Sequence, residues 1–131
     1  MSSPTEFIND MPATETFGME IIGASDGRAT ARLPFQEKFC FDSGDNPVLH
    51  GAATFALADN AGAAAVMSHF EEPQPAYTID LRIDYLDAAR AALSAEAEVL
   101  RYGSVVGVAD IIVEDADDNA VAVARGTYRS A

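Results

Sequence analysis

An alanine-dominated stretch at residues 52–68 is the feature that most constrains how this chain folds. Alanine is the strongest helix former, so the composition predicts one long helix that ends before Pro73. The stretch is apolar on nearly every side, which is typical of a helix buried in a core. It contains Asp59 and Asn60 and is short for a membrane span. We therefore expect a buried central helix and no membrane partner.

The segments around this helix have the apolar alternation of β-strands. Between residues 28 and 33, for example, Ala29, Ala31 and Leu33 alternate with polar side chains. A short helix is predicted at 5–11, strands at 17–22, 28–35, 77–86, 93–102, 105–113 and 120–128, and turns at 23–27 and 115–119. The simplest packing is an α+β fold in which an antiparallel sheet covers the single helix. One sheet leaves other surface open, so a dimer is also expected.

Length and charge restrict the class of protein. A chain of 131 residues fits a single domain over 1–131. The 21 acidic and 8 basic residues give a net charge of −13, which disfavours nucleic acid and anionic membranes. A lone Cys40 excludes a disulfide framework, and no Cys/His cluster has metal-ligand spacing. Residues 1–12 lack the features of a signal peptide, so we expect a cytoplasmic protein.

Residues 23–27 match the G-x-S-x-G pattern of a hydrolase nucleophile elbow. That motif requires a helix directly afterwards, whereas the residues that follow alternate as a strand. The chain is also too short for that hydrolase fold. The pattern therefore predicts an ordinary turn.

Asp59 is difficult to reconcile with a buried helix, because burying an unpaired carboxylate costs several kcal/mol. A partner group, an interface or a function must compensate. His50 and Gly51 precede the helix, where free backbone N–H groups favour negative charge. Gly51 permits close approach of a ligand, and such a terminus can bind an oxyanion. The residues alone leave a functional role and a hydrogen-bonded interface equally open for Asp59.

Asp59 lies eight residues after Gly51, about 12 Å along a helix axis. The two groups are too far apart to act on one carbonyl from the same helix. Two antiparallel helices across a dimer axis would bring Asp59 of one subunit close to Gly51 of the other. The predicted site therefore requires a dimer.

The sequence from Leu49 to Asp59 resembles the helix motif of the hotdog-fold acyl-CoA thioesterases. The most similar group is the phenylacetate-degradation type, which is related to the 4-hydroxybenzoyl-CoA thioesterases. Their pattern is His-Gly-Gly, an apolar spacer and Leu-Ala-Asp, and residues 78–86 resemble their next strand. The order of elements agrees from about residue 17 to residue 129. Two positions depart from the pattern: Ala52 replaces the second glycine, and Gly44 stands where the family has asparagine.

The resemblance implies a hotdog fold, with a sheet wrapped around one long helix, and a role for each matching residue. Asp59 would be the catalytic carboxylate, acting as general base or nucleophile. Gly51 of the opposite subunit would donate its N–H to the thioester oxygen, and His50 would shape that turn. Asn46, if the loop is two residues shorter, would orient the carbonyl or the water. Thr78 matches a hydroxyl that holds the attacking water, although it is equally an ordinary strand residue.

The implied function is hydrolysis of a small or medium, including aromatic, acyl-CoA thioester. Coenzyme A is then part of the substrate and no separate cofactor is expected. The expected assembly is a homodimer or a dimer of dimers. The net negative charge repels the phosphates of coenzyme A at long range, so local arginines are needed. Candidates are Arg82, Arg101, Arg125 and Arg129.

Two other functions fit the same residues less well. A hotdog hydratase or dehydratase pairs a carboxylate with a histidine on one substrate, whereas His50 and Asp59 are nine residues apart. A non-catalytic acyl-CoA-binding module would keep the fold and lack the chemistry. Hydrolysis assays separate this module from the thioesterase.

Overall fold

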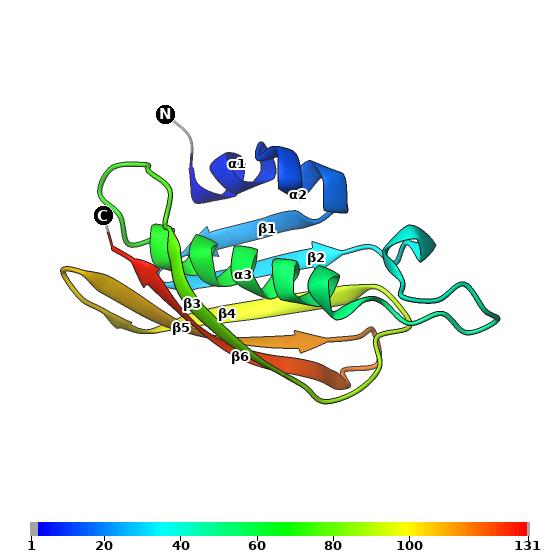
Figure 1. Cartoon of the computed structure of the whole chain (residues 1–131). Helices are drawn as coiled ribbons and strands as arrows, with labels where there is room; N and C mark the ends of the chain where they lie inside the picture. Colours follow the sequence, from blue (N-terminus) through cyan, green and yellow to red (C-terminus); the bar gives the residue numbers. More distant parts are fainter. Residues whose placement is uncertain (1–2, 131) are drawn as a thin grey trace.

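The alanine-rich stretch forms α3, Gly51–Met67, which lies across one face of a curled six-stranded sheet (Figure 1). The computed structural model describes residues 3–130. The other helices are α1, Pro4–Asn9, α2, Pro12–Phe17, and the 3-10 turn η1, Glu37–Phe39. The strands are β1, Glu20–Ser25, β2, Arg28–Leu33, β3, Thr78–Tyr85, β4, Leu93–Tyr102, β5, Val106–Glu114, and β6, Ala120–Arg129.

The sheet has the order β1-β2-β4-β5-β6-β3, and all neighbouring strands are antiparallel. The α+β fold predicted from the sequence is therefore confirmed. β1 and β3 form the two edges. The first residue of β3, Thr78, pairs with Tyr128 of β6, which places these side chains close to the middle of α3.

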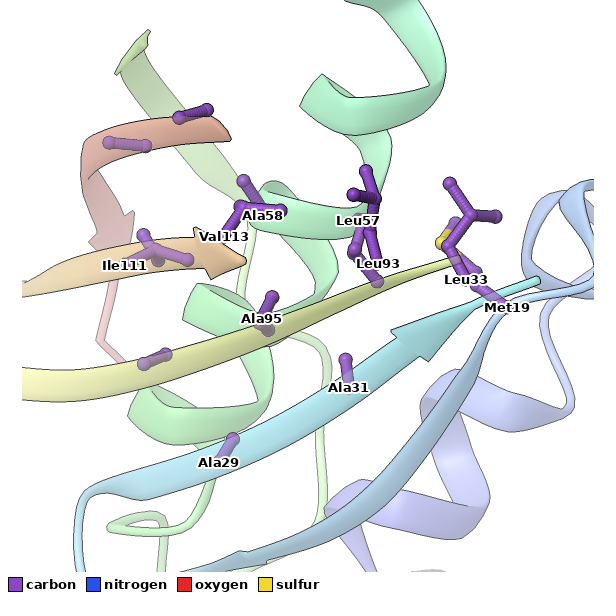
Figure 2. Close-up of a cluster of buried hydrophobic side chains, with 14 of the residues drawn as sticks. Met19, Ala29, Ala31, Leu33, Leu57, Ala58, Leu93, Ala95, Ile111 and Val113 are labelled. Carbon is purple, nitrogen blue, oxygen red and sulfur yellow. The ribbon is translucent and has the colours of Figure 1, made fainter. Parts of the chain in front are cut away.

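The core lies between α3 and the concave face of the sheet. Ala58, Ala61 and Ala65 of α3 are fully buried, as is Ala95 of β4. Figure 2 shows larger side chains close to Ala58 and Ala95 in the same core, including Leu57, Leu93 and Ile111. Small side chains on facing elements let the helix approach the sheet closely, which explains why an apolar alanine helix is stable here.

The N-terminal region differs from the prediction. The predicted helix at 5–11 is α1, which ends at Asn9, and a second short helix that was not predicted, α2, begins at Pro12. Phe17, predicted to start a strand, is the last residue of α2, and Gly18 ends that helix with a φ of 73°. β1 therefore begins at Glu20.

The predicted turn at 23–27 is also wrong in its extent. β1 continues through Gly23, after a register shift between Ile21 and Gly23, and ends at Ser25. The turn itself is Asp26-Gly27, with φ of 52° and 77°. Positive φ at both central residues is what the type I′ turn of a two-residue β-hairpin requires. A strand follows directly, so these residues do not form a nucleophile elbow.

Among residues 3–130, no helix has the length and apolar character needed to cross a membrane. In the same part of the chain, His, Cys, Asp and Glu side chains form no group of three or more suited to a metal ion.

Candidate active site

The Asp59 carboxylate lies where α3 meets the ends of β3 and β6. Its Oδ1 accepts a 2.7 Å hydrogen bond from the Thr78 hydroxyl. The main-chain carbonyl of Asp59 accepts a 3.2 Å hydrogen bond from the Tyr128 hydroxyl. Thr78 and Tyr128 are paired across neighbouring strands, so the sheet fixes their relative positions. Asp59 therefore has partners within its own chain, and it remains half-buried.

Burial raises the pKa of Asp59 above the usual value for an aspartate. The hydrogen bond from Thr78 and the nearby Tyr128 hydroxyl oppose this rise, because both favour the charged form. Burial also raises the pKa of Tyr128, and the charge of Asp59 adds to that effect. Tyr128 therefore stays protonated as a hydrogen-bond donor, and Asp59 is a better base than an exposed aspartate.

Tyr128 was not predicted as a site residue. Its side chain is fully buried and lies against two glycines, Gly62 of α3 and Gly126 of β6. A Cβ on Gly62 would overlap the Tyr128 hydroxyl, and a Cβ on Gly126 would lie 2.5 Å from the tyrosine ring. A glycine inside a helix and another inside a strand are the sequence signals that could have indicated this close approach.

A mostly apolar cavity of about 250 Å³ adjoins Asp59. Its walls come from α1, from α3 and from residues 75–78. Asp59, Asn60 and Thr78 supply polar groups, and side chains such as Phe7 and Met67 supply the apolar surface. A carboxylate beside an apolar cavity is suited to act on a substrate that buries an apolar group.

His50 and Gly51 begin α3 as predicted. The His50 Nδ1 accepts a 2.9 Å hydrogen bond from the Ala52 N–H, so the ring caps the helix. The Tyr85 hydroxyl donates a 2.8 Å hydrogen bond to the Gly51 carbonyl. Among residues 3–130, no acceptor takes the Gly51 N–H. That N–H is available to a ligand or to a partner chain.

Within one chain, only some of the predicted site residues come together. Asp59 and Thr78 are in direct contact, whereas Gly51 lines a different cavity, of about 300 Å³, beside Tyr85. Asn46 lies in an exposed loop, where its carbonyl accepts a 2.7 Å hydrogen bond from Arg90. It lines neither of these cavities.

Comparison with known proteins decides the family. Residues 46–122, more than half of the chain, match the thioesterase superfamily. The chain belongs to this family. As a member of the thioesterase superfamily it is a thioester hydrolase, and the hotdog fold predicted from the resemblance is confirmed.

Individual relatives agree with this assignment. A Halobacterium salinarum protein with the provisional name of an esterase is 38% identical, over 94% of this chain and 87% of that protein. The 1,4-dihydroxy-2-naphthoyl-CoA hydrolase of Listeria monocytogenes is 26% identical, over 89% of this chain and 94% of its own length. The structure of the Escherichia coli PaaI protein, from the phenylacetic acid degradation operon, is 27% identical with a TM-score of 0.83, covering 95% of this chain and 88% of PaaI.

Two of the four candidate arginines of this thioesterase lie on the opposite face of the sheet from α3. Arg82 bonds Asp84 at 3.4 Å. Arg125 holds Asp110 through two hydrogen bonds, of 2.6 and 3.0 Å. These acids partly neutralise the guanidinium groups, which weakens both arginines as phosphate ligands. Arg101 and Arg129 are exposed and form no ion pair among residues 3–130.

Proposed function

We propose that this thioesterase hydrolyses acyl-CoA thioesters with small or medium acyl groups, including aromatic ones. The observation that carries the proposal is the Asp59 carboxylate, which has a raised pKa, a Thr78 hydroxyl 2.7 Å away and an apolar cavity of about 250 Å³ beside it. The acyl group would occupy the cavity, and the thioester carbonyl would lie beside the carboxylate.

The chemistry requires few groups because a thioester is already activated. As a general base, Asp59 would take a proton from water while the water oxygen bonds to the carbonyl carbon. The negative charge would develop on the carbonyl oxygen and would be stabilised by a backbone N–H. The C–S bond then breaks, and coenzyme A leaves as a thiolate that takes up a proton. As a nucleophile, Asp59 would instead form an anhydride that water hydrolyses.

We further propose that the oxyanion donor is the Gly51 N–H of a second copy, in a homodimer. Several apolar side chains are exposed on α3 and along the edge strand β3, which runs from Thr78 near Asp59 to Tyr85 near Gly51. They include Ile79, which is 60% exposed, Tyr85, which is 52% exposed, and Phe55, which is 37% exposed. An apolar edge strand of this kind is usually covered in the native protein. Pairing of two such dimers, and a cytoplasmic location, remain part of the proposal.

The first test is hydrolysis of a panel of alkyl- and aryl-CoA thioesters by the wild type and by Asp59→Asn. We expect kcat to fall by about 10²–10⁴-fold in the variant. Asp117→Asn, an exposed aspartate in the hairpin between β5 and β6, is the matched control and should keep wild-type activity. Equal hydrolysis by Asp59→Asn and the wild type would exclude the role given to Asp59.

The second test addresses the N–H of Gly51. Gly51→Pro removes this N–H at the first helical position, where proline fits the helix and where His50 already has an extended backbone, with ψ of 138°. Gly51→Ala makes a similar Cβ contact with Tyr85, about 3.0 Å, and keeps the N–H. We expect kcat to fall by about 10²–10³-fold in the proline variant and much less in the alanine variant.

Mixed dimers test the contribution of both subunits. Asp59→Asn and Gly51→Pro are each expected to be nearly inactive alone. Unfolded together and refolded, they form heterodimers in which one of the two sites has both an intact Asp59 and an intact Gly51. Random mixing should restore about a quarter of wild-type activity. A mixture as inactive as its components would exclude a shared site.

Single-turnover hydrolysis in ¹⁸O-labelled water separates the two roles of Asp59. A general base delivers labelled oxygen to the product acid in the first turnover. A nucleophile whose anhydride is hydrolysed by water at the aspartyl carbonyl instead leaves its own unlabelled oxygen in the product acid and becomes labelled itself. Unlabelled acid in the first turnover, together with label in Asp59, therefore identifies this nucleophilic route.

The geometry disfavours a hydratase. The His50 Nδ1 is used to cap the helix at the Ala52 N–H, and His50 lies at the N-terminus of α3, whereas Asp59 lies in the middle of that helix. A binding module remains distinguishable by experiment, because it would bind acyl-CoA thioesters tightly without hydrolysing any of them.

A further inference from the structure

The cavity beside Asp59 has one wall that the catalytic roles do not explain. The N-terminal helix α1 supplies Phe7 and Ile8 to it, and Met11, which lies between α1 and α2, also lines it. Ala63 and Met67 of α3 line the same cavity. We propose that α1 sets which acyl groups fit, and that the cavity takes an uncharged acyl group of about single-ring size. This inference rests on the proposed function, which places the thioester carbonyl beside Asp59.

Hydrogen bonds and core packing hold α1 and the following α2 in place against the sheet and against α3. The Asn9 side chain makes two hydrogen bonds with the main chain of Ile21 in β1, of 3.0 and 2.7 Å. Ile8 is only 2% exposed and belongs to the main core. The Asn60 amide donates a 3.0 Å hydrogen bond to the buried Thr14 of α2. Because α1 is anchored to the sheet and α2 to α3, the size of the cavity is set before a ligand binds.

The volume limits the ligand. An apolar cavity of about 150 Å³ is sufficient for benzene. The cavity of about 250 Å³ therefore has room for one aromatic ring on a short spacer, or for an alkyl chain of roughly six to eight carbons. A long acyl chain would extend beyond the α1 wall and leave apolar surface in water.

The charge of the lining limits the ligand further. Asp59 is the one charged side chain among the described residues that line the cavity, and it is negative. An acyl group that ends in a carboxylate would lose its hydration, meet no cation and be repelled by Asp59. Acyl groups derived from dicarboxylic acids are therefore excluded by Asp59 and by the absence of a cationic side chain among the described lining residues.

Non-hydrolysable coenzyme A thioethers test the inference independently of catalysis. The probes are S-butyl-, S-hexyl-, S-phenethyl-, S-dodecyl- and S-carboxyethyl-CoA, and the dissociation constant is measured by calorimetry. In the wild type we expect affinity to increase by about fourfold per methylene up to the hexyl and phenethyl probes. It should not increase further for the dodecyl probe, and the carboxyethyl probe should bind weakest.

Two variants change the cavity from different elements. Met11→Ala enlarges it at the end of α1 and should move the optimum to longer chains. Ala63→Leu fills it from α3 and should move the optimum to shorter chains, by about three carbons. Ala13→Leu makes the same substitution at an exposed position of α2 that does not line this cavity, and it should leave the profile unchanged. Thermal unfolding shows which variants are folded. One folded cavity variant is sufficient to test whether the size profile depends on this cavity.

The outcomes separate this inference from the proposed function. Hydrolysis of the thioester panel with a size profile that neither cavity variant moves would overturn the α1 wall and leave the thioesterase intact. A size profile that moves as expected, without hydrolysis of any thioester, would support the cavity and overturn the acyl-CoA thioesterase proposal. Equal binding of all probes by the wild type would overturn the inference directly.

Discussion

The Tyr128 hydroxyl occupies the space that a Cβ on Gly62 would need. This relationship joins β6 to the middle of α3, close to Asp59, whose carbonyl accepts the hydrogen bond from the same hydroxyl. The positions of the helix and of the buried tyrosine therefore depend on each other.

Gly62→Ala should destabilise the protein although alanine is the better helix former. The new methyl group would force Tyr128 or α3 to move, and overpacking of this kind costs about 1–3 kcal/mol of unfolding free energy. Urea unfolding measures this change. Gly44→Ala is the matched control, because a Cβ there meets nothing within 4 Å. A Gly62→Ala protein as stable as Gly44→Ala would contradict the packing described for Tyr128.

Thr78→Val should move the acid limb of the kcat/KM profile to higher pH. Thr78 donates to the Asp59 carboxylate and lowers its pKa, so removal of the hydroxyl lets burial raise that pKa further. The pH dependence of kcat/KM for one good thioester substrate measures the shift. Thr127→Val removes a hydroxyl from β6 that makes no hydrogen bond among the described residues, and its acid limb should coincide with that of the wild type. An unmoved limb in Thr78→Val would mean that another group controls the profile.

Tyr128→Phe should leave the fold intact and reduce stability by about 1 kcal/mol, the usual value of one hydrogen bond. The tyrosine hydroxyl also lowers the pKa of Asp59, so this variant should move the acid limb upward in pH as well. A purely structural tyrosine would change the denaturation midpoint without moving the limb. Measurement of both quantities on the same preparation distinguishes the two roles.

Asp59→Asn should be more stable than the wild type at neutral pH. Folding raises the pKa of Asp59. The contribution of this side chain to the free energy of unfolding is therefore fully present below the unfolded-state pKa, and it is lost as pH rises through the folded-state pKa. Asparagine has no such loss and can still accept the Thr78 hydrogen bond. The difference in unfolding free energy between the two proteins should therefore grow with pH from near zero in acid. A difference that does not depend on pH would contradict the raised pKa.

Much of the fold follows from the sequence for physical reasons. The alanine stretch required a buried helix, and the alternation of Ala29, Ala31 and Leu33 correctly predicted the inward face of β2. α2 was missed because six residues are too few to show helical periodicity, and Gly18 ends that helix only through its positive φ. Such short elements are decided by their caps and by tertiary packing.

The candidate site was predictable only in part. Asp59 was identified because a carboxylate among alanines needs an explanation, and its contact with Thr78 agrees with the resemblance. Tyr128 was not identified, since its approach to α3 depends on how β6 packs against the helix. The pairing of Asp59 with a Gly51 N–H lies beyond a single chain, and it stays a prediction.

The groups that hold Asp59 belong to α3 and the sheet, whereas the opposite wall of the cavity belongs to an N-terminal segment attached through Asn9 and Thr14. Substitutions of the cavity-lining side chains of that segment, Phe7 and Met11, can therefore change the cavity without removing a hydrogen bond of Asp59 or of Asn60. Proteins descended from one ancestral chain would then differ in the acyl groups that they accept while they share the same hydrolytic centre.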